Sequence, residues 1–177
     1  MDMVMVCKIA GFCCVLFASG YFAYGLSRTL EQRVYELRKL YSILLQLKSE
    51  IQYMNSTLPE CFLKLSTNLA EPFLSWLKFL ADGMQQTQEK SFCEIWQKGL
   101  EILEQGSALC EEDIIPLKEL SDKLGAMDIT SQLKAIDYVL LHIERNRNIL
   151  ETELTQKKKV AVTLSLFCGF MTLILLL

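Results

Sequence analysis

Histidine and closely paired cysteines are almost absent from this chain. Only one of its 177 residues, His142, is a histidine, and none of the seven cysteines stands in a Cys-x-x-Cys pair. A zinc site needs several such ligands at short spacing, and a disulfide framework needs an even set of cysteines. Neither kind of site is expected here, and no cofactor is indicated. The cysteines are expected to be reduced and mostly buried.

The patterns of β-sheet proteins and of phosphate-binding loops are missing as well. No segment of any length alternates strictly between apolar and polar residues, and neither common type of glycine-rich phosphate loop occurs. The formal net charge is −3, so the chain lacks the basic footprint of a nucleic-acid-binding protein. These absences favour an all-α protein that has no nucleic-acid partner.

Each end of the chain carries an uncharged apolar run of 18 residues, 9–26 and 160–177. A helix of that length reaches roughly 27 Å, close to the ~30 Å hydrocarbon core of a bilayer. Both runs are therefore predicted to be transmembrane helices, with the lipid bilayer as a partner. The alternative for the first run is a cleaved signal peptide ending near Ala18-Ser19-Gly20. Basic residues follow this run instead of preceding it, which favours a retained anchor.

Basic residues beside the two runs predict the orientation of the middle segment. Cytoplasmic flanks of membrane spans carry an excess of Lys and Arg. Only Lys8 lies on the outer side, against nine residues on the inner side: Arg28, Arg33, Arg38, Lys39, Arg145, Arg147, Lys157, Lys158 and Lys159. We therefore expect residues 1–8 outside the cytoplasm and residues 27–159 as a cytoplasmic domain of a two-span protein of the cell membrane.

The middle segment has helical periodicity throughout. Apolar residues between 30 and 53, and again between 129 and 154, recur at spacings of three and four, which predicts two long helices continuous with the spans. Four shorter helices are expected after Thr57, from Pro72 to near Gly83, from Ser91 to Gly106, and from about Glu111 to Gly125. The expected fold is all-α: a six-helix bundle with a long antiparallel helical hairpin, flanked by two terminal transmembrane helices.

Capping signals mark where several of these helices begin. Thr57 and Glu60 fit a capping box, with Pro59 tolerated in the first turn, and Asp128 fits the N-cap of the last helix. The acidic triplet Glu111-Glu112-Asp113 would complement the partial positive charge of a helix N-terminus. The same triplet is also a candidate contact for a protein partner.

Enzyme chemistry has little support in the sequence. A thiol enzyme would need a cysteine paired with His142, and nothing local marks a cysteine as reactive. No catalytic residue is assigned, and Trp76 and Trp96 are interpreted as core or interface anchors. A membrane-tethered thiol enzyme or redox sensor that uses Cys61, Cys93 or Cys110 remains the alternative from another class of function.

Two motifs resemble those of a known family. Residues 50–60 read E-I-Q-Y-M-N-S-T-L-P-E, similar to the family pattern E-I-x-Y-x-x-T-P-L-P-E, although Ser56 and Thr57 stand where the family often has Thr and Pro. Residues 124–132 read L-G-A-M-D-I-T-S-Q, similar to L-G-x-x-D-x-x-x-Q. The chain resembles the stage III sporulation protein AB family of endospore-forming bacteria over its whole length. The motif residues that we expect to be structurally critical are Glu50, Tyr53, Thr57, Pro59, Glu60, Gly125, Asp128 and Gln132.

The resemblance implies a function in sporulation. Family members are similar in their cytoplasmic domain to the inner-membrane platform proteins of type II secretion and type IV pili. The implied location is the mother-cell membrane around the forespore, in an assembly that links the two cells. The implied partners are a secretion-type ATPase, stage III sporulation protein AA, and the other membrane subunits of the complex; a homo-oligomer is also compatible. A passive structural adaptor is the plainer alternative.

The second motif leads to an expectation about Gly125. If its φ angle is positive, Gly125→Val should destabilise the domain by ~1 kcal/mol or more, because residues with a Cβ atom are strained in the left-handed region.

Overall fold

The chain folds into helices joined by short connections. The computed structural model describes the backbone of residues 3–53, 57–86, 91–125 and 128–176, and the side chains of residues 28–160 within these ranges together with 163, 164 and 167. The helices are α1 (Met3–Tyr53), α2 (Leu58–Ser66), α3 (Phe73–Gln86), α4 (Phe92–Gly106), α5 (Glu111–Leu124) and α6 (Ile129–Leu176). The described ranges contain no strand, and the predicted all-α fold with six helices is confirmed.

Two compact units divide the chain, residues 1–32 with 150–177 and residues 33–149. In the first unit, Lys158 Nζ lies 2.7 Å from Glu31 Oε1. The side chains of the predicted span 9–26, and most of those of 160–177, lie outside the described residues. Within the part of the chain that is described, no helix combines the length and the apolar character needed to cross a membrane. The two spans therefore stay predictions.

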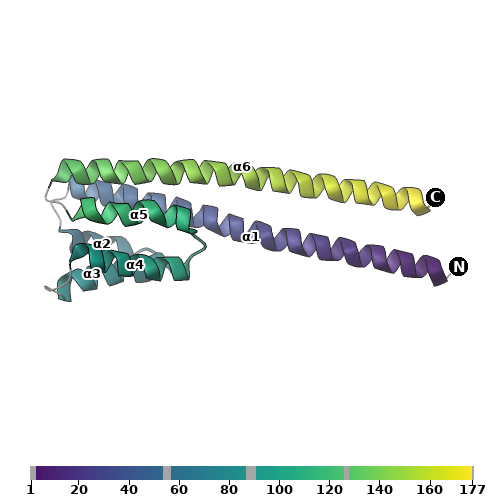
Figure 1. The fold of residues 1–177 in the computed structure, drawn as a ribbon, viewed down its shortest axis with the longest axis horizontal. Helices are drawn as coiled ribbons and strands as arrows, with labels where there is room; N and C mark the ends of the chain where they lie inside the picture. The colour runs from purple at the N-terminus through teal and green to yellow at the C-terminus, as the bar shows by residue number, and fades with distance from the viewer. Residues whose placement is uncertain (1–2, 54–56, 87–90, 126–127, 177) are drawn as a thin grey trace. The chain divides into compact units, whose positions relative to one another are not determined.

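In the second unit, α1 and α6 lie side by side in opposite directions (Figure 1). Lys48 Nζ is 2.5 Å from Asp137 Oδ1, and the guanidinium of Arg147 is 5.9 Å from the ring centroid of Tyr41. Between these two contacts the residue number falls along α1 and rises along α6. The predicted antiparallel hairpin is therefore present within residues 33–149.

Both long helices bury a stripe of apolar side chains. In α1 the buried stripe includes Leu37, Leu40, Leu44 and Leu47, and in α6 it includes Ile136, Val139, Leu140 and Ile143. These spacings of three and four place the side chains on one face of each helix. Ile129, the first residue of α6, is half exposed and is not part of the stripe.

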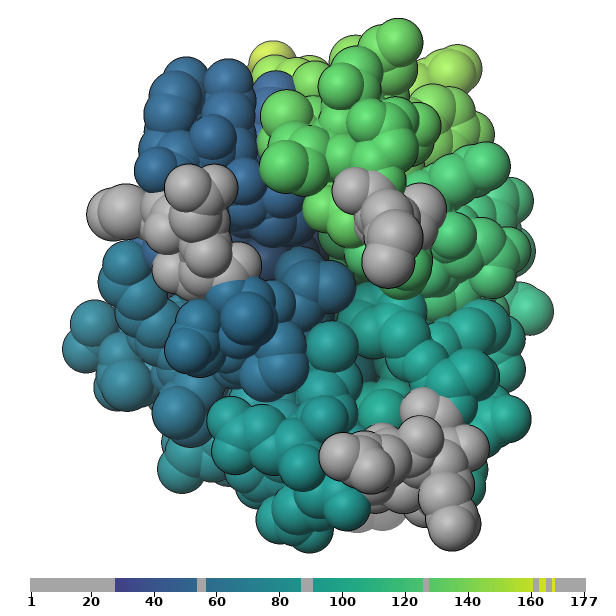
Figure 2. All heavy atoms as spheres, turned by 90° about the vertical axis from the view of Figure 1, so that its left-hand side faces the viewer, coloured from purple at the N-terminus to yellow at the C-terminus, as the bar shows by residue number. Residues whose placement is uncertain are grey.

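Helices α2 to α5 complete this unit. Neighbours in sequence pack together from α2 to α5, and the end view in Figure 2 shows them beside slate-blue α1 and green α6. Trp96 of α4 is fully buried, with its ring centroid 5.7 Å from that of Trp76 in α3 and 6.1 Å from that of Phe62 in α2. Its Nε1–H donates to the Leu117 carbonyl of α5 at 2.7 Å. Trp96 therefore joins four helices in the core.

Two glycines allow α3 and α4 to approach closely. A Cβ atom on Gly83 would lie 2.8 Å from Ile95 Cγ2, and one on Gly99 would lie 2.8 Å from Leu80 Cδ2. Gly83 was expected near the end of its helix, yet α3 continues to Gln86. Gly83 is therefore needed for helix packing, and it does not terminate the helix.

We expect Gly99→Val to lower the free energy of unfolding by about 1–3 kcal/mol, because a branched side chain must displace Leu80 and Trp76 from a filled core. Urea denaturation followed by tryptophan fluorescence measures the effect. Lys98→Val is the matched control, since it places the same side chain at the neighbouring exposed position of α4. Equal stability of the two variants would contradict the packing role of Gly99.

Candidate functional site

The end of α1 is tied to α2 through the first motif. Glu50 Oε1 accepts a hydrogen bond from Lys64 Nζ of α2 at 2.6 Å. Tyr53, three residues later, is 73% exposed. Glu50 therefore contributes to the α1–α2 corner, whereas the ring of Tyr53 adds little to the core and is available at the surface.

The same motif caps α2. Thr57 is the N-cap residue, and its backbone N–H donates to Glu60 Oε2 at 3.0 Å. This bond lowers the pKa of Glu60, because it stabilises the charged carboxylate. Pro59 lies in the first turn, where its missing N–H has no partner to lose. The predicted capping box is confirmed.

The second motif caps two helices at once. Asp128 accepts hydrogen bonds from the backbone N–H groups of Thr130 and Ser131 at 3.1 and 3.0 Å, so it is the N-cap of α6 as predicted. Gln132 Nε2 donates to the Leu124 carbonyl at the end of α5, at 2.9 Å. The motif therefore joins the end of α5 to the start of α6.

Gly125 does not have the backbone conformation on which the Gly125→Val expectation depended. Its φ and ψ are −73° and −7°, in the right-handed helical region, so the premise of a positive φ is wrong. A Cβ atom there would lie 3.3 Å from Cδ1 of Phe92. Close packing against this ring, and not a left-handed turn, favours glycine at the position.

The acidic triplet at the start of α5 divides into buried and exposed parts. Glu111 and Glu112 are exposed, but the side chain of Asp113 is fully buried. Its carboxylate accepts hydrogen bonds from Arg33 Nε of α1 at 2.7 Å and from Arg33 Nη2 at 3.1 Å. Asn146 Nδ2 of α6 donates to it at 3.2 Å. Asp113 is therefore not accessible to a protein partner, and its carboxylate instead connects α5 to α1 and α6 inside the bundle.

Hydrogen bonds keep the buried Asp113 carboxylate charged. Burial alone would raise its pKa, but the bonds from Arg33 and from the Cys110 backbone N–H outweigh burial, so the pKa of Asp113 lies below its ordinary value. Cys110 is the N-cap residue of α5, and Asp113 supplies the carboxylate of this capping box. One side chain thus caps α5 and binds α1 and α6.

A second polar contact from α1 supports the α4–α5 connection. The buried Glu36 accepts a hydrogen bond from the Ala108 backbone N–H at 2.6 Å. No sequence motif marks Glu36, and Arg33 is notable in the sequence only as one of the basic residues near a span. Arg33 is nevertheless spaced by four residues from the buried Leu37, which places a charge in register with an apolar stripe. This spacing is the sequence feature that could have identified Arg33 as a residue facing the core.

Two of the thiols that the structure describes, those of Cys61 and Cys110, lack the lowered pKa of a catalytic cysteine. Burial raises the pKa of Cys61. The pKa of Cys110 is raised mainly by burial and to a smaller extent by the negative charge of Asp113. A nucleophilic thiol needs the opposite shift. Cys93 Sγ lies 3.4 Å from Ser121 Oγ, in a contact between α4 and α5. The thiol alternative therefore gains no support from Cys61 or Cys110.

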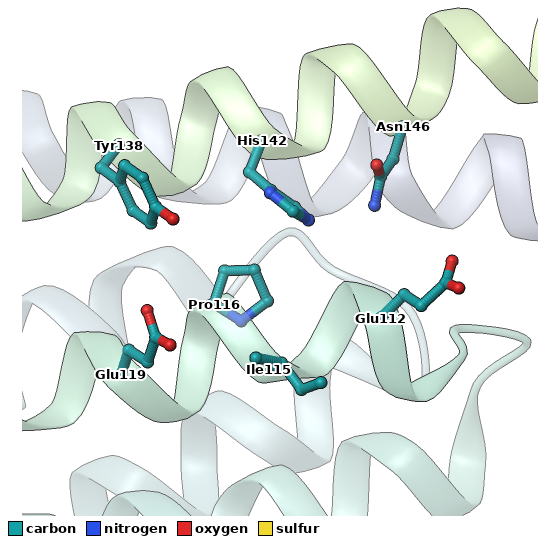
Figure 3. A pocket seen from close by; sticks show the side chains of 7 residues that line it. All are labelled: Glu112, Ile115, Pro116, Glu119, Tyr138, His142 and Asn146. Atoms are coloured by element: carbon teal, nitrogen blue, oxygen red, sulfur yellow. The ribbon is translucent and has the colours of Figure 1, made fainter.

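A groove that the sequence did not predict lies between α5 and α6, with a volume of about 270 Å³. Figure 3 shows its side chains, and those of α6 point toward α5. The lining residues are Glu112, Ile115, Pro116 and Glu119 of α5 and Tyr138, His142 and Asn146 of α6. His142, considered above only as the partner that a thiol enzyme would need, lines this groove.

Comparisons with known proteins agree with the resemblance in the two motifs. The family described as stage III sporulation protein AB matches residues 8–177. The stage III sporulation protein AB of Bacillus subtilis (strain 168) is 22% identical over 170 residues, which cover 96% of this chain and 99% of the relative. A solved structure named stage III sporulation protein AB (SpoIIIAB) has a similar fold, with a TM-score of 0.65 and 24% identity over 70% of this chain and 97% of that one. Because the family match extends over nearly the whole sequence, the chain belongs to the stage III sporulation protein AB family.

Proposed function

We propose that this chain is a non-enzymatic membrane platform of the sporulation channel complex between mother cell and forespore. In this role it couples a secretion-type ATPase, stage III sporulation protein AA, to the membrane subunits of the complex. Membership of a sporulation family supports the biological setting. The resemblance of that family to secretion platform proteins supports the coupling role.

The observation that carries the proposal is the position of the Asp113 carboxylate. It belongs to α5 and binds Arg33 of α1 and Asn146 of α6. Breaking such a buried ion pair leaves an uncompensated charge, which is costly. A displacement of α5 is therefore expected to move α1 and α6 with it, and these are the helices that contain the two predicted spans.

The charge pattern supports the location that we propose. The basic flanks of the two apolar runs favour residues 27–159 in the mother-cell cytoplasm, with both runs in the membrane around the forespore. An ATPase in that cytoplasm could then reach Glu111 and Glu112, the exposed acids of α5.

Binding of the ATPase to the full-length chain in an uncharged detergent tests the proposal. We expect saturable binding to the wild type, weakened severalfold in E111Q/E112Q, because rim charges contribute modestly to association. The matched control is E101Q/E104Q, which removes the same charge from exposed positions of α4 and should bind as the wild type does.

Reproducible absence of binding, in the presence of the other membrane subunits, would count against the platform role. Assembly with those subunits without ATPase binding would favour the passive adaptor. Equal binding of the ATPase by the wild type and both variants would show that Glu111 and Glu112 do not contribute to the contact, and it would still support the platform role.

A further inference from the structure

Three consecutive lysines of α6, Lys157, Lys158 and Lys159, directly precede the apolar run 160–177. Helix α6 continues through both segments without a break (Figure 1). The three side chains are exposed, and we call them the lysine cluster. Successive residues of a helix are rotated by about 100° and rise by about 1.5 Å, so these side chains project over roughly 200° of the helix circumference within about 3 Å of its length. The lysine cluster therefore presents positive charge around more than half of α6 at one level.

Carboxylates of the same unit occupy the lysine cluster only in part. Lys158 Nζ lies 2.7 Å from Glu31 Oε1, and Lys157 Nζ lies 3.9 Å from Glu153 Oε2. These four side chains are between 45% and 62% exposed, and ion pairs between such exposed groups contribute little to stability. Among the described residues, Lys159 has no carboxylate partner. The lysine cluster is thus available to anions from outside the chain.

An exposed apolar stripe begins directly after the lysine cluster. Val160, Leu164 and Phe167 are 63%, 60% and 70% exposed, and their spacing of four and three places them on one face of α6. The hydroxyl group of Thr163 is satisfied within the helix, because Oγ1 donates to the Lys159 carbonyl at 2.9 Å. An exposed apolar surface whose nearby hydroxyl group needs no water suits the hydrocarbon region of a bilayer.

The directions of the three lysines favour a lipid layer over a protein partner. Lys158 lies roughly 160° around the helix from Val160, so a protein packed on the apolar stripe would not reach it. Phospholipid headgroups, in contrast, surround an inserted helix on every side at one depth. Lysine side chains near the end of a span extend to that depth, and basic residues beside a span attract anionic lipids.

We propose that the lysine cluster binds the phosphate groups of anionic phospholipids at the surface of the membrane. A free phosphate ion would satisfy the charges, but it would leave Val160, Leu164 and Phe167 exposed to water. A phospholipid supplies the negative charge and the apolar surroundings together. The inference rests on the membrane location proposed above, and it does not depend on an ATPase partner.

Spin-labelled lipids measure this preference in the full-length chain. The protein is placed in phosphatidylcholine vesicles that contain a trace of spin-labelled phosphatidylglycerol or spin-labelled phosphatidylcholine. Electron paramagnetic resonance then gives the fraction of each label that the protein immobilises. We expect the wild type to select phosphatidylglycerol about threefold over phosphatidylcholine in low salt, because lysines at the headgroup level attract anionic lipids. The selection should decline in 1 M salt, where the Debye length falls to about 3 Å.

Two triple variants test the lysine cluster itself. K157Q/K158Q/K159Q should lose most of the selection, because it keeps long polar side chains without their charge. K157R/K158R/K159R should keep the selection, because arginine carries the same charge. Circular dichroism of both variants verifies that their helix content is unchanged.

The matched control is K98Q/K118Q/K123Q, which removes three positive charges from exposed positions of α4 and α5 and should select phosphatidylglycerol as the wild type does. Equal immobilisation of the two labels by the wild type, or unchanged selection in K157Q/K158Q/K159Q, would overturn the proposal. So would an equal loss of selection in the control, since net charge would then explain the effect. Unchanged lipid selection in K157Q/K158Q/K159Q together with failed assembly with the membrane subunits would assign the lysine cluster to a protein contact instead.

The ATPase experiment is done in detergent and gives a separate answer. Selection of phosphatidylglycerol without ATPase binding would keep the lipid site and remove the coupling role. ATPase binding without lipid selection would keep the coupling role and remove the lipid site. Failure of the wild type to enter the vesicles would overturn the membrane location and the lipid site together.

Discussion

Replacing Arg33 with leucine is expected to lower the free energy of unfolding of the bundle by about 3–5 kcal/mol, which is the usual cost of removing one member of a buried ion pair. The Asp113 side chain is fully buried and would lose the two shortest of its side-chain hydrogen bonds. Asn146 and the Cys110 N–H could not replace the lost positive charge. Urea denaturation of the full-length protein, followed by tryptophan fluorescence, measures the loss.

The pH dependence separates this explanation from simple loss of packing. In the wild type the pKa of Asp113 is lowered by folding, so its contribution to stability is present at neutral pH and is lost as the pH falls below about 4. In Arg33→Leu, burial without the guanidinium should raise that pKa, and acid should relieve the cost of the buried charge. The stability difference between the two proteins should therefore shrink on acidification.

Two further variants complete this experiment. Arg33→Leu/Asp113→Leu should recover part of the stability, since no charge is left buried. Lys118→Ala, at an exposed position of α5, is the control for loss of one positive charge and should change little. A stability difference that is constant with pH would show that the ion pair is not the reason for the loss.

Trp96→Ala is the second substitution with a large expected effect, again about 3–5 kcal/mol. The indole is fully buried against Trp76 and Phe62, so truncation leaves a cavity where α2, α3 and α4 meet. It also leaves the Leu117 carbonyl without the Nε1 donor from α4. Chemical denaturation followed by circular dichroism measures the change.

Matched substitutions distinguish cavity formation from loss of the hydrogen bond. Trp96→Phe should cost less than Trp96→Ala, because most of the ring packing is kept and the Nε1 bond is lost. Tyr53→Ala removes an aromatic ring that is mostly exposed and should stay within about 0.5 kcal/mol of the wild type. A similar cost for Tyr53→Ala and Trp96→Ala would refute the central position of Trp96 in the core.

Local sequence patterns predicted most of the fold. The apolar stripe of α1 and the caps at Thr57 and Asp128 depend on residues within a few positions of one another. Such features can be recognised from the sequence alone, because helix periodicity and capping involve only residues that are close together in the chain. The six helices followed from them, whereas the antiparallel hairpin was predicted because both long helices are continuous with the two predicted spans.

Two expectations failed because they depended on contacts with distant residues. The Gly125→Val expectation was conditional on a positive φ, which Gly125 does not have, and the nearby residue there is Phe92 on another helix. Asp113 was grouped with two surface acids, although it is spaced by four residues from the buried Leu117. Register with a buried stripe indicates burial, but it does not identify the partner of a buried charge.

The all-α class, the caps, the family and the apolar runs at the two ends were predictable from the order of residues alone. The meeting of Arg33, Asp113 and Asn146, and the groove that Glu112 and Glu119 share with Tyr138, depend on how the helices pack. Arg33 and Asp113 are 80 positions apart along the chain. Helix formation depends on residues within a turn of each other, whereas the pairing of buried charges depends on how whole helices pack. Local patterns therefore specify the helices, and helix packing creates the buried ion pair and the groove.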